Sequence, residues 1–408
     1  MIKCVKIKNF KSIKDMEVEV GQFNVIIGEN GAGKSNFAEA LTVFGAIEDN
    51  KMDKGLLQNR GVRVLQGRSL VSKFGDSNFA KIQVTQSDQP DFPDGFVNEI
   101  SLGESDEAYS KIGYSYKSLK YHWMNFFMKE ELDSFLKENS AKEKSDKADA
   151  ISDFLGLAMN PESDIGLRVR DNTQNKIYDP SGLGLVKGFL IYSPEYSILR
   201  EEVVRDVVVE PLGVKGDGLL KLLSYMKENE QDAFKDVLEC ASMFSWVSNI
   251  EVCDLEQISG NSDSKITIID KYINEKIFYK IANEGLLFVL FYAAVFCSKQ
   301  TPRAFAIDNI DASLNPKMCR VLTGKLVSLA KKYNKQVFVT THNPAVLDGL
   351  NLHDDDQRLF VAQRNDLGHS LLERVTVDDL PKPTRSGQTI TLGEAFMRGH
   401  LGALPKNF

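Results

Sequence analysis

The feature that most constrains this chain is a glycine-rich stretch near its start, Gly28-Glu29-Asn30-Gly31-Ala32-Gly33-Lys34-Ser35. It matches the phosphate-binding pattern G-x-x-x-x-G-K-[ST] at every fixed position. An apolar, β-branched run precedes it at residues 23–27, and good helix formers with apolar residues at helical spacing follow it at residues 36–44. The sequence therefore predicts a buried strand, a phosphate-binding loop and a helix, in the order that this motif requires.

The residue types of this stretch suit the binding of a phosphate chain. Glycines allow backbone torsions that a Cβ would forbid, and they leave room for the phosphates. Successive backbone N–H groups and the positive end of the following helix then hold the anion. Lys34 is expected to reach the β- and γ-phosphates, and the Ser35 hydroxyl is expected to ligate Mg²⁺. The predicted nucleotide-binding residues of the loop are Asn30, Gly31, Ala32, Gly33, Lys34, Ser35 and Asn36.

Length and composition narrow the class of protein. The chain has 408 residues, which is long for one compact core, so we expect two lobes. No apolar run approaches the ~20 residues that span a bilayer. The N-terminus shows no signal-peptide pattern and the five cysteines are scattered, so we expect reduced thiols, no zinc site and a cytoplasmic location. The net charge of −7 leaves nucleic-acid binding open only through a local basic patch.

Periodicity indicates an antiparallel sheet in the first lobe and helices after it. Residues 2–8 and 16–20 alternate on either side of a turn, and residues 80–86 and 114–121 alternate as further strands. The pattern becomes helical from residue 123 to 157. Later helices are expected at 219–247, 317–333 and 391–399, and later strands at 188–192, 250–252, 265–269, 304–308 and 336–342. Residues 358–363 and 370–377 are expected to form a final hairpin.

A resemblance to a known family rests first on the N-terminal motifs. Lys8-Asn9-Phe10-Lys11-Ser12-Ile13, followed closely by the glycine-rich stretch, resembles the N-terminal lobe of the RecF/SMC/OLD-like group of ABC-type ATPases. This resemblance implies a glutamine within residues 51–79 that senses Mg²⁺ and the γ-phosphate. Gln58 and Gln66 are both available, and nothing in the sequence chooses between them. The helical segment 123–157 is far too short for the coiled-coil arms of SMC proteins.

The resemblance continues ahead of an apolar run at residues 288–297. Asn283-Glu284-Gly285 resembles the degenerate signature loop of this group, in which a serine, any residue and a glycine open a helix, and Asn283 stands where serine is usual. A helix N-terminus with a small residue can bind a phosphate. By resemblance, Asn283 and Gly285 would contact the γ-phosphate of a nucleotide held by a second subunit. Taken alone, the stretch is an ordinary helix cap.

Two further strand ends carry polar residues that match the family. Ala304–Asp308 is an apolar strand that ends in an acid, the Walker B pattern, in which the aspartate holds the Mg²⁺ shell. The family then has a glutamate as general base, but this chain has Asn309, whose amide cannot take a proton. Asp311, two residues beyond Asn309, matches a second acid of OLD-like sequences. His342, at the end of the apolar strand that begins at Gln336, matches the switch histidine that contacts the γ-phosphate. The catalytic candidates are therefore Asn309, Asp311 and His342, and the metal ligands are Ser35 and Asp308.

These motifs predict an α/β fold, an ABC-type ATPase head with a mixed, largely parallel doubly wound sheet, an antiparallel β lobe and a helical insertion. Four segments are expected. They are an N-terminal ATPase lobe at 1–122, an inserted, mostly helical lobe at 123–250, a C-terminal ATPase lobe at 251–380, and a linker with a C-terminal tail at 381–408.

The predicted function is an ATPase that uses ATP and Mg²⁺, forms a homodimer or higher homo-oligomer around nucleotide, and controls a protein effector or nuclease, with no membrane partner. By resemblance, many bacterial proteins of this kind serve in anti-phage defence or DNA repair. Because Asn309 replaces the usual base, a nucleotide-gated scaffold with little hydrolysis is the first alternative. A RecF-like DNA-binding ATPase is the second, which the acidic balance disfavours. A kinase or transferase would leave His342 and the signature-like loop unexplained.

Overall fold

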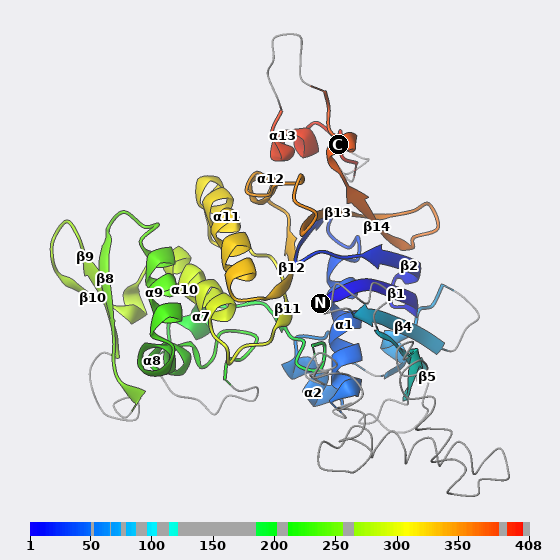
Figure 1. Ribbon diagram of the computed structural model, residues 1–408, viewed down its shortest axis with the longest axis horizontal. Coiled ribbons are helices and arrows are strands. Elements are labelled where there is room, and N and C mark those ends of the chain that lie inside the picture. Colours follow the sequence, from blue (N-terminus) through cyan, green and yellow to red (C-terminus); the bar gives the residue numbers. More distant parts are fainter. Residues whose placement is uncertain are drawn as a thin grey trace, which may run out of the picture.

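The computed structural model contains a central six-stranded sheet that carries the glycine-rich loop (Figure 1). It describes residues 1–49, 53–65, 67–74, 79–86, 96–103, 114–120, 185–201, 211–255, 265–382 and 390–402. The central sheet has the order β14-β13-β3-β12-β11-β7, and neighbours are parallel except in the hairpin β13–β14. Its strands are β3 (Phe23–Gly28), β7 (Ile191–Tyr192), β11 (Ala304–Ile307), β12 (Gln336–Thr341), β13 (Gln357–Arg364) and β14 (Ser370–Val375).

Side-chain alternation in the central strands divides the core into two layers. In β3, Val25 and Ile27 face one layer and Ile26 faces the other. In β12, Val339 belongs to the first layer and Phe338 to the second. Helices α8 (Leu219–Asn229), α9 (Gln231–Ala241), α10 (Glu284–Cys297) and α11 (Pro316–Lys332) cover the first layer. The second layer lies between the central sheet, α1 (Lys34–Glu48) and an antiparallel sheet.

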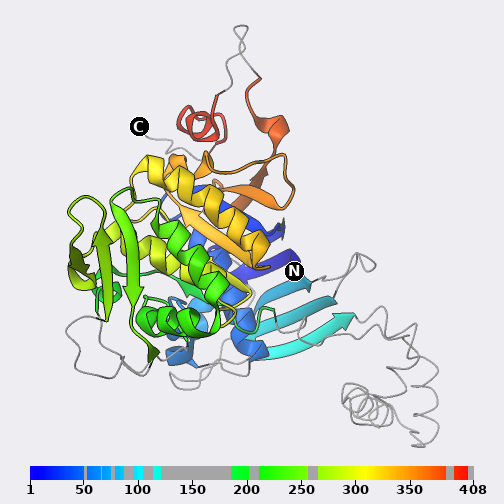
Figure 2. The same ribbon diagram turned by 60° about the vertical axis from the view of Figure 1, so that its left-hand side comes forward.

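Helix α10 is apolar on every side and is buried from Gly285 to Cys297. A helix of this composition is stable only inside a core. Its aromatic rings contact the central strands, as in the edge-to-face pair of Phe296 with Phe305 on β11, at 5.3 Å between centroids. The helical layer is seen most clearly in Figure 2, on the opposite side of the central sheet from the antiparallel sheet.

The antiparallel sheet has the order β2-β1-β4-β5-β6. Its strands are β1 (Ile2–Phe10), β2 (Ile13–Glu19), β4 (Phe79–Gln86), β5 (Phe96–Gly103) and β6 (Tyr114–Lys120). The sequence predicts four of these strands and misses β5, which lies between β4 and β6. The pairing of β5 with β6 shifts register between Val97 and Asn98. Such an irregularity interrupts the two-residue alternation by which a strand is recognised.

A small antiparallel sheet, in the order β10-β9-β8, lies at the outer side of the helical layer (Figure 1). Its strands are β8 (Val247–Val252), β9 (Ile266–Asp270) and β10 (Lys276–Phe278). The remaining elements are α2 (Lys54–Asn59), α7 (Tyr196–Leu199), α12 (Pro344–Leu347), α13 (Leu392–Met397) and 3-10 turns at Gly67–Leu70, Tyr279–Ile281 and Val377–Asp379. Within the described ranges, no helix has both the length and the apolar character needed to cross a membrane.

The predicted fold class is confirmed, because a largely parallel central sheet is combined with an antiparallel sheet and a helical layer. The helical pattern at 123–157 lies outside the described residues. Strand β7 falls within the range 123–250, which was expected to form an inserted lobe, yet Ile191 pairs with Ala306 in the central sheet. Part of that range therefore belongs to the head. The division into four segments stays a prediction.

Candidate functional site

Three glycines with positive φ shape the loop between β3 and α1. Gly28, Gly31 and Gly33 have φ angles of 155°, 80° and 101°. A Cβ on Gly28 would lie 2.1 Å from the carbonyl oxygen of Ala362, and a Cβ on Gly33 would lie 2.2 Å from Oγ of Ser370. Gly31 has no such neighbour within 4 Å. Packing therefore requires glycine at two of the positions, and the backbone torsion favours it at all three.

Lys34 is the first residue of α1 and is only 6% exposed. Its Nζ donates to the carbonyls of Gly28 and Glu29, both at 2.9 Å, so the loop surrounds the ammonium group. Burial lowers the pKa of Lys34 to about 8, while the carboxylates of Asp308 and Asp311 act in the opposite direction. An anion inside the loop would compensate this buried charge and raise the pKa again.

Ser35, Asp308 and Thr340 form a hydrogen-bonded group beside the loop. The Oγ of Ser35 lies 3.3 Å from each carboxylate oxygen of Asp308. Thr340, on β12, donates its hydroxyl to Oδ1 of the same carboxylate. The backbone N–H of Asp308 donates to the carbonyl of Tyr192 on β7 at 2.8 Å, which fixes the chain as it leaves β11. Residues from α1, β11 and β12 thus meet at one carboxylate.

The pair of Ser35 and Asp308 fits Mg²⁺. This ion binds oxygen ligands at about 2.0–2.1 Å in octahedral geometry, which places neighbouring ligand oxygens about 3 Å apart. The 3.3 Å separation of the Ser35 and Asp308 oxygens is close to that spacing. Mg²⁺ commonly takes only one or two protein ligands and completes its shell with phosphate oxygens and water. Accordingly, the described residues contain no group of three or more His, Cys, Asp or Glu that could hold a metal by themselves.

His342 follows β12 and approaches the loop. Its Nδ1 lies 3.5 Å from Nζ of Lys34. Burial, and then the charge of Lys34, lower the pKa of His342 below its usual value, so the ring is neutral at pH 7. A neutral imidazole beside the lysine can donate a hydrogen bond to a terminal phosphate.

The two residues considered for activating water differ in their surroundings. Asn309 is exposed and has a φ of 56°, a left-handed conformation that asparagine tolerates better than most residues. Its backbone N–H donates to the hydroxyl of Thr340 at 3.0 Å. Asp311 is half-buried, and its Oδ1 accepts from the hydroxyl of Thr341 at 2.6 Å. The carboxylate of Asp311 is therefore anchored to β12, whereas the exposed residue that follows Asp308 is Asn309, which carries an amide.

Contacts from β13 and β14 support the loop, and sequence reasoning missed them. Asn36 donates from Nδ2 to Oγ of Ser12 at 2.7 Å, and that oxygen lies 2.6 Å from Oγ of Ser370. Arg364 donates from Nε to the carbonyl of Gly31 at 2.8 Å. No local signal could have identified these partners, because Ser12 and Ser370 are 358 positions apart.

Glu39, on α1, fixes two segments next to the site. Lys11 and Arg63 both donate to its carboxylate, which is only 1% exposed. Gln58 donates from Nε2 to a backbone carbonyl of its own segment at 3.0 Å. Gln66 lies outside the described residues. The structure therefore leaves the choice of a glutamine sensor open.

The signature-like residues have contacts of their own at the start of α10. The Oδ1 of Asn283 accepts from the backbone N–H of Leu286 at 3.3 Å, as an N-cap does. Glu284 accepts from the hydroxyl of Ser313, in the loop before α11. A Cβ on Gly285 would lie 3.3 Å from the carbonyl oxygen of Ser313. Among the described residues, the contacts of Asn283 and Gly285 are with this region and not with Lys34 or Ser35, so the structure does not bring them into the same group.

Comparisons with known proteins bear on both halves of the site. The family described as "AAA ATPase domain" matches residues 1–154. The family described as "AAA domain, putative AbiEii toxin, Type IV TA system" matches residues 284–348. The first match contains the glycine-rich loop, and the second contains Asp308 and His342.

Individual relatives extend these matches. An uncharacterized protein of Methanocaldococcus jannaschii is 30% identical over 216 residues, which are 51% of this chain and 84% of the relative. A protein of Helicobacter pylori named ATP/GTP phosphatase is 24% identical over 361 residues, 86% of this chain and 88% of the relative. The crystal structure of an SMC head bound to the C-winged helix domain of ScpA superposes with a TM-score of 0.53 at 14% identity, over 92% of this chain and 98% of that chain. This last likeness concerns the fold alone.

Proposed function

This chain belongs to the SMC-like group of ABC-type ATPases, a family that binds and hydrolyses ATP, and from that membership we propose that the glycine-rich loop binds ATP with Mg²⁺ and that the chain hydrolyses it. In this proposal Lys34 pairs with the β- and γ-phosphates, Ser35 and Asp308 hold Mg²⁺, and His342 contacts the γ-phosphate. The metal would neutralise developing charge on the phosphates.

One observation carries the proposal: three segments that are distant in sequence meet at the loop. The contact between Ser35 and Asp308 joins positions 273 apart, and that between Lys34 and His342 joins positions 308 apart. These are a hydroxyl, a carboxylate, an ammonium group and an imidazole, which together match the demands of a metal-bound triphosphate. A glycine turn without function would not need this set.

ATP titration of the purified protein tests the proposal. Lys34→Ala removes the cation on the phosphates, so we expect ATP affinity to fall at least about tenfold, and Ser35→Ala should mainly weaken the Mg²⁺ dependence. Lys235→Ala, at an exposed lysine on α9, is the matched control and should bind as the wild type does. Wild-type affinity in Lys34→Ala would refute the assignment of the loop.

A nucleotide-gated scaffold is the second candidate, because an exposed amide occupies the position after Asp308. General-base catalysis contributes about 10²–10⁴-fold, so turnover well below ~1 s⁻¹ is expected without it. Asn309→Glu should speed single-turnover hydrolysis while ATP affinity is kept, at a stability cost of about 1 kcal/mol for a left-handed glutamate. Fast wild-type hydrolysis that disappears in Asp311→Ala would instead make Asp311 the base and exclude the scaffold.

We further propose that ATP brings two chains together. Asn283 is the exposed N-cap of α10, and Gly285 lies buried in the first turn of the helix. Within the described residues neither contacts Lys34, so we infer that this helix N-terminus binds a nucleotide on a second copy. The molar mass measured by light scattering with Mg²⁺ and a non-hydrolysable ATP analogue should double, and Lys34→Ala should stay at one protomer. A single-protomer mass at every concentration with bound analogue would contradict this.

The nucleotide state would be read by a partner protein, an effector or nuclease, in a setting such as bacterial anti-phage defence. Support comes from the relatives, since the SMC head was crystallised with a ScpA domain and the second matched family is described as a putative toxin of a toxin–antitoxin system. Affinity capture with and without the ATP analogue, using Lys34→Ala as the control, should yield an analogue-dependent partner. Turnover stimulated by DNA alone would favour the RecF-like alternative.

A further inference from the structure

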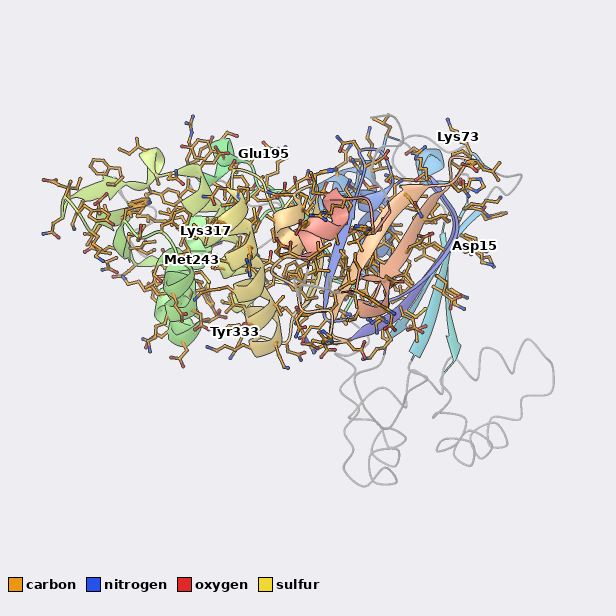
Figure 3. The ribbon with its side chains drawn as sticks, turned by 90° about the horizontal axis from the view of Figure 1, so that it is seen from above. Asp15, Lys73, Glu195, Met243, Lys317 and Tyr333 are labelled. Atoms are coloured by element: carbon orange, nitrogen blue, oxygen red, sulfur yellow. The ribbon has the colours of Figure 1, made fainter. Side chains whose placement is uncertain are left out.

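Two aromatic side chains from distant parts of the chain meet beside the glycine-rich loop. The ring centroids of Phe74 and His369 are 4.9 Å apart and the planes are inclined by 70°, which is an edge-to-face contact. Phe74 is 41% exposed, so the pair is not part of a sealed core. In Figure 3, the labelled neighbour Lys73 lies near the end of the hairpin β13–β14, which carries His369 between its strands.

Both rings are attached to the residues that support α1. On one side, the backbone N–H of Ser72 donates at 2.7 Å to the carbonyl of Asn9, near the end of β1 and three residues before Ser12. On the other side, Ser370 directly follows His369, and its Oγ lies 2.6 Å from Oγ of Ser12. Ser12 also accepts from Asn36 at 2.7 Å. The aromatic pair is therefore close in sequence to Ser370 and bonded through Ser72 to the strand that leads to Ser12, the residue that contacts Asn36.

The hairpin turn that holds His369 has a defined conformation. The Oδ1 of Asn365 accepts from the backbone N–H groups of Leu367 and His369, at 3.0 and 2.9 Å. Gly368 has a φ of 81°, and a Cβ there would be 3.5 Å from the ring of Phe74. The turn thus presents His369 in one place and packs against the second ring.

The position of Asn36 indicates where the α-phosphate and the ribose of a bound nucleotide lie. Lys34 is placed at the β- and γ-phosphates, so the α-phosphate and the ribose come next to the following residues of α1. We propose that Phe74 and His369 form the platform on which the base of this nucleotide stacks. This rests on the proposed function of the loop, and adds to it the group that recognises the base.

Stacking has a specific consequence for substrate choice. Every base has a π-face, so a platform that uses ring faces binds bases with little regard to their edges. Larger purine rings gain more from stacking than pyrimidines. The platform therefore accepts ATP and GTP with similar affinity, CTP and UTP with lower affinity, and inorganic tripolyphosphate with the lowest.

Competition titrations separate the platform from the loop. The affinities of ATP, GTP, CTP and inorganic tripolyphosphate are measured with Mg²⁺ for the wild type, Phe74→Ala and His369→Ala. We expect ATP affinity to fall at least about fivefold in each variant, as removal of one stacking ring does, while tripolyphosphate affinity stays unchanged. Phe74→Tyr keeps an aromatic face and should retain ATP affinity.

Phe278→Ala is the matched control, because it removes a phenylalanine of similar exposure, 51%, from the small outer sheet. It should leave every affinity unchanged. If Phe74→Ala lowers ATP and tripolyphosphate affinity equally, or lowers neither, the platform is refuted. Loss of analogue-dependent dimerisation with unchanged ATP affinity would also refute it and assign Phe74 to a protein interface. If the wild type binds neither ATP nor tripolyphosphate, the function proposed for the loop fails as well, which distinguishes the two failures.

Discussion

ATP affinity should decrease above pH 8, because the free protein then loses the proton of Lys34. Burial holds the pKa of this side chain at about 8, and among the described residues its Nζ contacts carbonyl oxygens of the loop and the ring of His342. Bound phosphates favour the charged form and raise the pKa, so binding takes up a proton at pH values between the free and bound pKa. Affinity is therefore nearly full well below pH 8 and is lost as the pH rises through this pKa.

The size of the effect follows from the protonated fraction of Lys34. If only that fraction binds ATP, the apparent Kd rises by a factor of about 2 at pH 8, about 10 at pH 9 and about 30 at pH 9.5. At pH 8, binding should also take up about half a proton. Calorimetric titration in buffers of different ionisation enthalpy measures both quantities on the same samples. His342 does not contribute, because its lowered pKa keeps it neutral over this range.

Lys34→Arg provides the control, since a guanidinium stays charged at every pH tested. Its affinity for ATP is expected to be lower at pH 7, because the larger group fits the loop less well, but it should not change up to pH 9.5. A constant wild-type Kd from pH 7 to 9.5 would refute the reasoning. So would a decline of the same size in Lys34→Arg.

Three further predictions concern single contacts. Gly33→Ala should reduce ATP affinity more than Gly31→Ala in the same titration. A Cβ at Gly33 would lie 2.2 Å from the Ser370 hydroxyl, whereas a Cβ at Gly31 would have no neighbour within 4 Å. Equal effects of the two substitutions would contradict this. Thr340→Val, which removes the hydroxyl donated to Asp308, should raise the Mg²⁺ concentration needed for half-maximal turnover and leave metal-free ATP binding unchanged. Lys335→Met should lower the free energy of unfolding in urea by about 2 kcal/mol, because the carbonyls of Ser298, Thr301 and Pro302 lose the bonds at 2.7–3.2 Å that Nζ of Lys335 donates to them. An unchanged midpoint would contradict this prediction.

Local sequence was sufficient for the strand, loop and helix around the glycines. The positive φ angles of Gly28 and Gly33 are a local property that glycine allows, whereas the packing there depends on the distant residues Ala362 and Ser370. Local sequence was likewise sufficient for the N-cap Asn283, whose side chain accepts from a backbone N–H group three residues later. Such features depend on short-range geometry, and a pattern of residue types can therefore predict them.

Other elements were beyond the reach of local patterns. The segment 219–247 was expected as one helical run, but the structure has two helices with a non-helical residue, Glu230, between them. Residues 358–363 and 370–377 were expected as a hairpin, which they are, but β13 is also parallel to β3 in the central sheet. A parallel partner can be anywhere along the chain, and the alternation of one strand does not identify it.

Most of the contacts at the loop that the sequence could not predict depend on the order of the strands in the central sheet. Strand β3 lies between β12 and β13, with Thr341 opposite Ile27 and Ala362 opposite Gly28. Residues at the carboxyl ends of β12 and β13 therefore approach the loop from both sides. His342 therefore reaches Lys34 from the β12 side, and Arg364 reaches the Gly31 carbonyl from the β13 side. His342 could be named in advance because a family resemblance supplied the order for its strand. No motif marked Arg364, so only the assembled sheet could place it at the loop.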